Sequence, residues 1–158
     1  MRILGIDAAT HRVGFAILED DKLITSGTWR LVPTKAPLYI RLTNLWGRLE
    51  ALQDVLLIDV VACEHPFVNP RARLDTAIRL GCAVGVVMGW AILYGLDFVL
   101  IAPTSAKKAA TGNGTASKLM VQEAVKQRYG LDSIEENAAD AVGVALAAQE
   151  KFNEQESG

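Results

Sequence analysis

Short apolar runs separated by polar turns fill the first thirty residues, and this pattern predicts three strands. The runs are Arg2–Asp7, Arg12–Glu19 and Lys22–Arg30, rich in Ile, Leu, Val and Phe. Polar pairs such as Asp20 and Asp21 interrupt them. Because the runs follow one another so closely, we expect an antiparallel meander.

Farther along the chain the apolar residues change to helical spacing. Leucines recur at steps of three and four residues and predict one helix: Leu38, Leu42, Leu45, Leu49 and Leu52. Buried strands are expected at residues 60–64 and 98–103, and helices at residues 73–94, 117–128 and 138–152. The order β-β-β-α-β-α-β-α-α predicts one α/β domain, residues 1–152, with a mixed sheet flanked by helices. Residues 153–158 are expected to form a flexible tail.

The longest uncharged run, residues 80–96, leaves a membrane span open as an alternative. It has 17 residues and four glycines, slightly short of the roughly 18 that a spanning helix needs. We therefore expect a buried helix of the domain. Gly81, Gly85 and Gly89 form a ridge of small residues that would admit either the sheet or a second copy of the helix.

Three acidic residues stand in apolar surroundings. Asp7 and Glu64 end two predicted core strands, and Asp140 lies within an apolar helix. If the two strands are parallel neighbours, both carboxylates lie at one edge of the sheet, where α/β proteins place their sites. Clustered carboxylates repel one another, and bound Mg²⁺ or Mn²⁺ would relieve that repulsion. Three unrelated element ends remain the alternative.

Composition narrows the class of protein. The 158 residues are half hydrophobic, and the two cysteines fit neither a metal site nor a disulfide framework, so we expect a cytoplasmic protein. Net charge is −2 but uneven. Residues 68–128 hold eight basic and three acidic side chains, whereas residues 131–158 hold seven acidic ones and a single lysine. The basic half is a candidate nucleic-acid surface, although ordinary scatter would also produce it.

The segment "TGNGTASK", residues 111–118, has the composition of a phosphate-binding loop. It lacks the Gly-Lys-Ser/Thr of a nucleotide-binding P-loop. With Lys107, Lys108 and Lys118 nearby, Gly112 and Gly114 are predicted to let the loop approach a DNA backbone. A plain flexible turn is the alternative.

Four motifs in order resemble the RuvC-type Holliday-junction resolvases of the RNase H-like superfamily. They are "GIDAATHRVGFAI", "CEHPF" followed by "ARLDTAIRLGCAVGVV", "PTSAKKAATGNGTASK" and "NAADAVGVALA", and the resemblance runs from Arg2 to Phe152. It implies an RNase H-like fold, antiparallel across its first three strands and parallel afterwards.

The resemblance also implies roles for individual residues. Asp7, Glu64 and Asp140 match metal-binding acids, and Lys107 and Lys118 match lysines that contact the scissile DNA. Phe67 matches an aromatic that wedges against bases at the junction centre, and the helix around Gly81 matches the dimerisation helix. We add Arg71 and Arg73 as DNA contacts. Phe67 packed in the core is the alternative for that residue.

Two positions depart from the family pattern. Ala8 and Ala9 replace a frequent Pro-Gly after the first acid, and Asn137 stands where many members have a fourth acid. Asn137 is either a neutral metal ligand, which makes it a candidate catalytic residue, or a helix N-cap. Glu136 is a further candidate ligand on the same helix.

We therefore predict a homodimeric endonuclease, dependent on Mg²⁺ or Mn²⁺ with two ions per subunit, that resolves four-way and other branched DNA by paired symmetric nicks. A catalytically weakened junction-binding protein and an RNase H-like nuclease acting on RNA are the alternatives. Actin-like ATPases and sugar kinases share the first motif, but Glu64 and Asp140 would repel their triphosphate.

Overall fold

A computed structural model describes residues 1–66 and 73–156 of the chain. Phe67 and Arg71 lie outside the described residues, so their predicted DNA contacts stay predictions. Five strands form one mixed sheet in the order β3-β2-β1-β4-β5. The strands are β1 (Arg2–Asp7), β2 (Arg12–Glu19), β3 (Lys22–Arg30), β4 (Val60–Glu64) and β5 (Asp97–Ile101).

Strand directions agree with the prediction. β1–β2 and β2–β3 are antiparallel, and β1–β4 and β4–β5 are parallel. In the β1–β4 register Ile6 lies opposite Cys63, so the next residues, Asp7 and Glu64, follow at the same edge of the sheet. The predicted α/β mixed sheet is confirmed.

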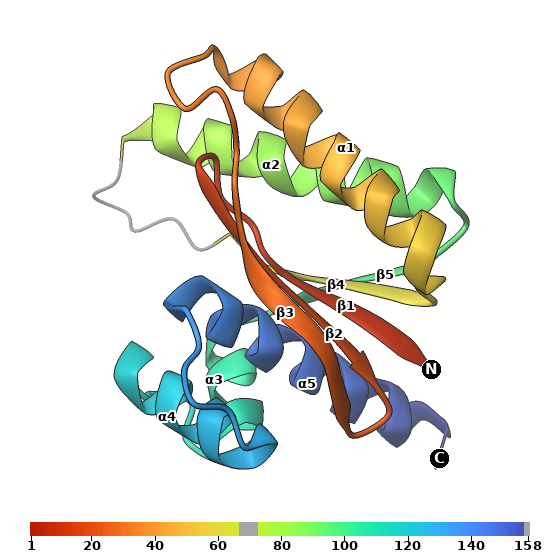
Figure 1. The fold of residues 1–158 in the computed structure, drawn as a ribbon, viewed down its shortest axis with the longest axis vertical. Helices are drawn as coiled ribbons and strands as arrows, with labels where there is room; N and C mark the ends of the chain where they lie inside the picture. Colours follow the sequence, from red (N-terminus) through yellow and green to blue (C-terminus); the bar gives the residue numbers. More distant parts are fainter. Residues whose placement is uncertain (67–72, 157–158) are drawn as a thin grey trace.

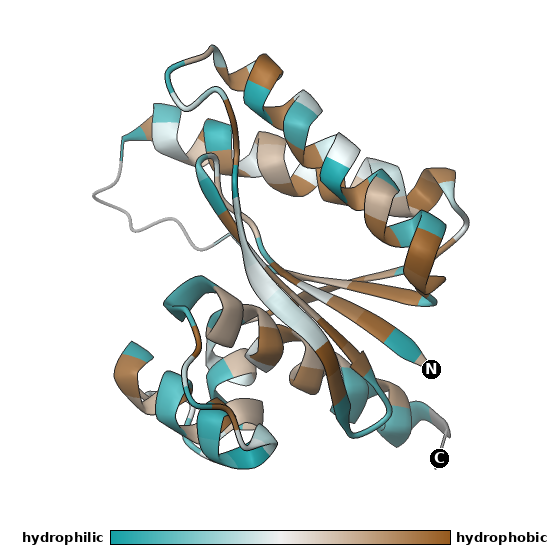
Figure 2. Cartoon of the chain, viewed as in Figure 1, coloured by the Kyte–Doolittle hydropathy of each residue, from teal (hydrophilic) through white to brown (hydrophobic). Residues whose placement is uncertain are grey.

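Helices cover both faces of the sheet (Figure 1). One face is covered by α1 (Leu38–Leu56) and α2 (Leu74–Leu93), and the other by α3 (Pro103–Thr111), α4 (Lys118–Tyr129) and α5 (Glu136–Glu156). Each face has its own hydrophobic cluster, with Leu45, Leu49 and Trp90 on the first and Val121, Val125 and Val142 on the second. Hydrophobic stretches accordingly mark the central strands and the helices beside them (Figure 2).

The structure corrects the predicted element order at one place. Residues 103–111 form α3, where the sequence predicted no helix, so the described part of the chain has five helices beside the sheet. Pro103 occupies the first turn and Gly112 ends the helix with a φ of 78°, which are the usual start and stop residues of a helix. The short apolar stripe of α3, with Ala106 and Ala109 buried, explains why hydrophobic spacing did not reveal it.

The C-terminal helix also extends beyond its expected bounds. α5 begins at Glu136 and continues to Glu156, past residue 153 where the tail was placed. It packs against β1, β2 and α3. Its first two turns supply Asn137 and Asp140.

One face of α2 is exposed, against the expectation of a buried helix. Val84, Val87 and Trp90 are buried, whereas Leu74, Ile78 and Ile92 are 76%, 56% and 66% exposed. Within the described residues no atom approaches within 4 Å of a Cβ built on Gly81, Gly85 or Gly89, so the glycine ridge does not pack on the sheet. α2 is also the one described helix long and apolar enough to cross a membrane, with a mean hydropathy of 1.8.

Candidate active site

Three acidic side chains from distant segments line one pocket of about 140 Å³. Asp7 comes from the end of β1, Glu64 from the end of β4, and Asp140 from the second turn of α5. Lys107 of α3 and Lys118 of α4 line the same pocket. The remaining lining residues are apolar or small: Pro103, Ala106, Val121 and Gly143.

Close backbone packing brings α5 to the acids on the sheet. A Cβ on Gly5 of β1 would lie 2.3 Å from the Ala141 carbonyl oxygen, and one on Gly14 of β2 would lie 1.9 Å from that of Asn137. A Cβ on Gly143 would lie 2.9 Å from the Ala106 carbonyl oxygen of α3. These three glycines therefore let the helix and its Asp140 approach β1 and α3.

The carboxyl groups hold protons more tightly than free ones do. Burial, followed by the charges of Glu64 and Asp140, raises the pKa of Asp7 to about 8. Burial and then the Asp140 charge raise the pKa of Glu64, and a hydrogen bond joins the Asp7 and Glu64 carboxyl groups. Burial also raises the pKa of Asp140, while Lys118 acts in the opposite direction. Near neutral pH the Asp7–Glu64 pair consequently shares a proton.

Lys118 connects the pocket to the start of α5. Its ammonium group contacts the Glu136 carboxylate and lies 3.8 Å from Asp140 Oδ2. The hydrogen bond from Glu136 is the largest cause that raises the pKa of Lys118. This ion pair was not predicted, because the two residues are 18 positions apart and each lies at the first position of its own helix.

Asn137 lies outside this pocket. It lines a neighbouring one with Arg12, Glu135 and Glu136, and its backbone carbonyl packs over Gly14. The structure thus brings together three of the four predicted ligands. In the described part of the chain no three Asp, Glu, His or Cys side chains are close enough to hold a metal ion as they stand.

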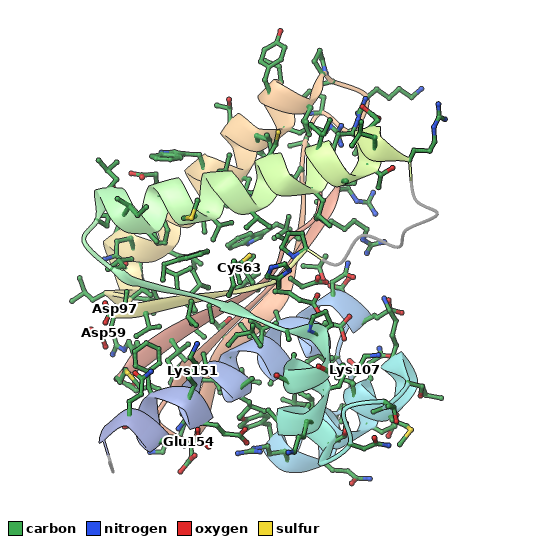
Figure 3. All side chains as sticks on the ribbon, turned by 180° about the vertical axis from the view of Figure 1, so that it is seen from behind. Asp59, Cys63, Asp97, Lys107, Lys151 and Glu154 are labelled. Atoms are coloured by element: carbon green, nitrogen blue, oxygen red, sulfur yellow. The ribbon has the colours of Figure 1, made fainter. Side chains whose placement is uncertain are left out.

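The other predicted DNA contacts among the described residues do not line this pocket. Arg73 is exposed at the N-cap of α2, and Gly112 and Gly114 flank Asn113 in the loop between α3 and α4. Lys108 faces a separate groove beside β5 with Glu150, Lys151 and Glu154. Figure 3 shows Lys107 on α3 at the carboxyl end of β4 and β5, and Lys151 and Glu154 on α5.

A family model described as "Crossover junction endodeoxyribonuclease RuvC" matches residues 3–148, most of the chain. The chain belongs to the RuvC family. Proteins named crossover junction endodeoxyribonuclease RuvC are 35% identical in Dehalococcoides mccartyi, over 92% of this chain and 90% of that protein, and 38% identical in Halorhodospira halophila, over 92% and 87%. The resemblance inferred from the four motifs is thereby confirmed, and the chain is an endonuclease of the RuvC class.

Solved structures agree with this assignment. The RuvC structure from Thermus thermophilus matches with a TM-score of 0.80 and 25% identity, covering 98% of this chain and 97% of that one. The structure of Thermus thermophilus RuvC in complex with Holliday junction substrate has the same fold, with a TM-score of 0.81 and 23% identity over 97% and 96% of the two chains. The predicted RNase H-like fold is confirmed by these matches to RuvC.

Proposed function

We propose that this RuvC-family enzyme resolves four-way DNA junctions and cuts other branched DNA at the pocket of Asp7, Glu64 and Asp140. The observation that supports this is the convergence of the three carboxylates from β1, β4 and α5. Burial, and after it the charges within the cluster, raise the pKa values of these acids, and such perturbed groups concentrate at functional sites. Relatives of this chain are named crossover junction endodeoxyribonucleases.

The donor set suits Mg²⁺ or Mn²⁺, and we propose two ions per subunit. Hard divalent cations prefer carboxylate oxygens, and three carboxylate side chains line this pocket. When bound, two such ions supply an activated water and stabilise the leaving oxygen of a phosphodiester. For binding, the Asp7–Glu64 pair has to release its shared proton, and Asp140 has to release the ammonium group of Lys118.

Lys107 and Lys118 are placed to hold the scissile phosphate. Both line the pocket, and Lys118 is 60% exposed, so a phosphate can reach Lys118 from solvent. An approaching phosphate offers Lys118 a replacement for Glu136. Lys108 and Arg73, together with the loop that contains Gly112 and Gly114, would contact DNA farther from the cut.

The enzyme is proposed to act as a homodimer through α2. The exposed stripe of this helix runs from Leu74 and Ile78 past Gly85 to Met88 and Ile92, on the side opposite the core. A second copy of the same helix would cover this apolar stripe, and the glycines would allow close contact. Two-fold symmetry in the protein would match the two-fold symmetry of a four-way junction and give one nick per subunit.

One assay tests the function. A labelled four-way junction, a linear duplex and an RNA duplex of equal length are each incubated with and without Mg²⁺. Nicking of the junction alone, with Mg²⁺ only, is the expected result, and Asp7→Asn and Glu64→Gln should abolish it while junction binding persists. Binding without nicking would assign the chain as a catalytically weakened junction-binding protein, and cleavage of RNA would assign a different nuclease.

A further inference from the structure

A groove leads away from the catalytic pocket between the loop after β1 and the first half of α2. One pocket of about 260 Å³ includes Asp7, Glu64 and Leu80 among its walls. A second pocket of about 270 Å³ also has Leu80 in its wall, and it is lined by Ala9, Thr10, His11, Thr76 and Arg79. The two pockets therefore adjoin at Leu80, and we call them together the α2 groove.

The fold explains why this space stays open. The core face of α2 carries Ala83, Val87 and Trp90, which are buried. Thr76 and Leu80 continue the same face toward the N-terminus, at steps of three and four residues. There the helix faces residues 9–11 and the ends of β1 and β4. The first turns of α2 thus form one wall and the loop forms the other.

Hydrogen bonds hold the loop that forms one wall of the groove. Arg41, the one buried charged residue in the described part of the chain, donates from its guanidinium group to the Thr10 and Ala36 carbonyl oxygens. The His11 carbonyl oxygen accepts a hydrogen bond of 2.8 Å from the Leu31 backbone N–H. Both anchors approach from α1 and β3, which leaves the opposite side of the loop open to the groove.

The groove presents hydrogen-bond donors above apolar walls. Arg79 Nε donates to Asp75 Oδ2 at 2.7 Å, and the Arg79 side chain is 47% exposed. That bond uses one of five guanidinium donors and leaves the terminal nitrogens for an anion. Exposed His11 and the Thr76 hydroxyl add two more polar groups, while Ala9 and Leu80 are apolar. This combination suits a phosphate followed by a sugar.

Distance relates the groove to the cut. His11 follows Asp7 by four residues, so their Cα atoms are at most about 14 Å apart. A DNA strand whose scissile phosphate lies at Asp7 and Glu64 has its neighbouring phosphates within such a distance. The groove is thus within reach of the strand that is cut.

We propose that the α2 groove holds the continuation of the cleaved strand and that Arg79, with His11 and Thr76, contacts a backbone phosphate near the scissile one. The proposal rests on the proposed function. Arg79, His11 and Thr76 lie within the first two sequence motifs, but no DNA contact was predicted from the sequence for any of them. Asp75 positions Arg79 through its Nε and keeps the terminal nitrogens directed away from the ion pair.

The test uses junction binding in EDTA, so that no cleavage occurs, measured by fluorescence anisotropy at several salt concentrations. Arg79→Gln should weaken binding roughly fivefold and lower the salt slope by about one, whereas Arg79→Lys should keep most of the slope. Arg48→Gln, which removes an exposed arginine of α1, is the matched control and should change neither. Thermal unfolding should be unchanged, because exposed ion pairs contribute little to stability.

A methylphosphonate scan then locates the contact. Single neutral linkages are placed at each position along the cleaved strand. One neutral linkage near the scissile position should weaken junction binding by the wild type. The same linkage should not weaken binding by Arg79→Gln, because that variant already lacks the arginine charge that contacts this phosphate. Equal penalties for both proteins at every position would overturn the proposal, and so would a monomeric Arg79→Gln in light scattering, which would assign the groove to the dimer contact. Failure of the proposed function would show separately, as absence of nicking in Mg²⁺.

Discussion

At the residue scale, a hydrogen bond and a lysine offset the repulsion among the acids of the pocket. Asp7 and Glu64 share a hydrogen bond, and Lys118 lies 3.8 Å from Asp140. Each arrangement lowers the repulsion among carboxylates that burial would otherwise intensify. The same side chains are consequently ready to exchange a proton and an ammonium group for divalent cations.

The stability of the metal-free protein should therefore fall with rising pH because of Asp7. The pKa of Asp7 is about 8 in the folded protein, against 3.8 for an unperturbed aspartate. The folded state thus binds the extra proton between these values, and stability is lost as pH rises through this range. Asp7→Asn should remove that loss. The free energy of unfolding of this variant, relative to the wild type, should therefore increase by up to about 1.4 kcal/mol per pH unit.

Urea unfolding in EDTA at pH 5.5 and pH 8 measures this effect. Asp132→Asn, at an exposed carboxylate, serves as the control and should track the wild type. Adding Mg²⁺ at pH 8 should stabilise the wild type and leave Asp7→Asn unchanged. Parallel pH profiles for the wild type and Asp7→Asn would contradict the assignment of the raised pKa to Asp7.

Asn137 allows a second test at this scale. It lies one helical turn before Asp140 but lines the neighbouring pocket with Glu136. A carboxylate at this position adds negative charge close to the site, so Asn137→Asp should lower the Mg²⁺ concentration for half-maximal cleavage by roughly two- to fivefold. Asn137→Ala should raise that concentration, because it removes the amide oxygen that we propose as a neutral ligand.

Glu136→Gln is the comparison for that titration. Glu136 is expected to hold Lys118 and not to bind metal. The effect of Glu136→Gln on Mn²⁺ binding, measured without DNA, should then largely disappear when Lys118→Met is also present. An unchanged titration for Asn137→Asp, together with an upward shift for Glu136→Gln in both backgrounds, would identify Glu136 as the ligand and refute the role of Asn137.

At the element scale, the packing of α5 on β1 and β2 sets the geometry of the site. Gly5 and Gly14 remove two side chains from the interface between strand and helix. The backbone of α5 then lies directly on the sheet, and Asp140 reaches the carboxyl ends of β1 and β4. Neither glycine has a positive φ, so close approach, and not backbone conformation, explains them.

Gly5→Ala should be severely disruptive. Its methyl group would meet the Ala141 carbonyl oxygen at 2.3 Å and Ala145 at 2.8 Å, and backbone atoms cannot rotate away. Overpacking of this kind costs about 3 kcal/mol and should displace α5, so that metal binding weakens along with stability. Chemical unfolding and Mn²⁺ titration measure the two losses. Gly47→Ala on α1, where the added methyl meets open space, should lose neither, and an equally stable Gly5→Ala would refute the close packing.

At the scale of the whole molecule, two lysines of the pocket lie at one end of the parallel strands. Lys107 and Lys118 lie at the carboxyl ends beside the three acids, whereas Asp59 and Asp97 lie where β4 and β5 begin (Figure 3). The two lysines favour the approach of a phosphate to the catalytic edge. The exposed stripe of α2 adds an apolar surface on a third side.

Gly85→Leu tests whether that stripe is the dimer contact. A Cβ on Gly85 meets open space, and leucine improves helix propensity by about 1 kcal/mol. A loss of dimer with undiminished thermal stability is therefore expected from light scattering at micromolar concentration, together with loss of paired nicking. Gly47→Leu, equally open on α1, is the control. A monomeric wild type, or a dimeric Gly85→Leu, would contradict the α2 interface.

The spacing of apolar residues predicted most strands and helices, because this spacing follows which residues along each element are buried. The strands β1, β2 and β3 and the leucine stripe of α1 follow directly from their apolar spacing. The small, polar helix α3 was missed, because only Ala106 and Ala109 of it are buried. The exposure of α2 was also missed, since apolar composition does not reveal which side of a helix remains without a partner.

By itself the sequence determined the fold class, the family and the three acids, because strand ends and apolar runs are local properties and the motifs are contiguous. Only the tertiary structure decided that Lys118 pairs with Glu136, that Asn137 faces the neighbouring pocket, and that Arg79 and His11 share a groove. Each of these depends on how the backbones of two separate elements approach one another. That approach is set by glycines and buried contacts far apart in the chain, which no local pattern encodes.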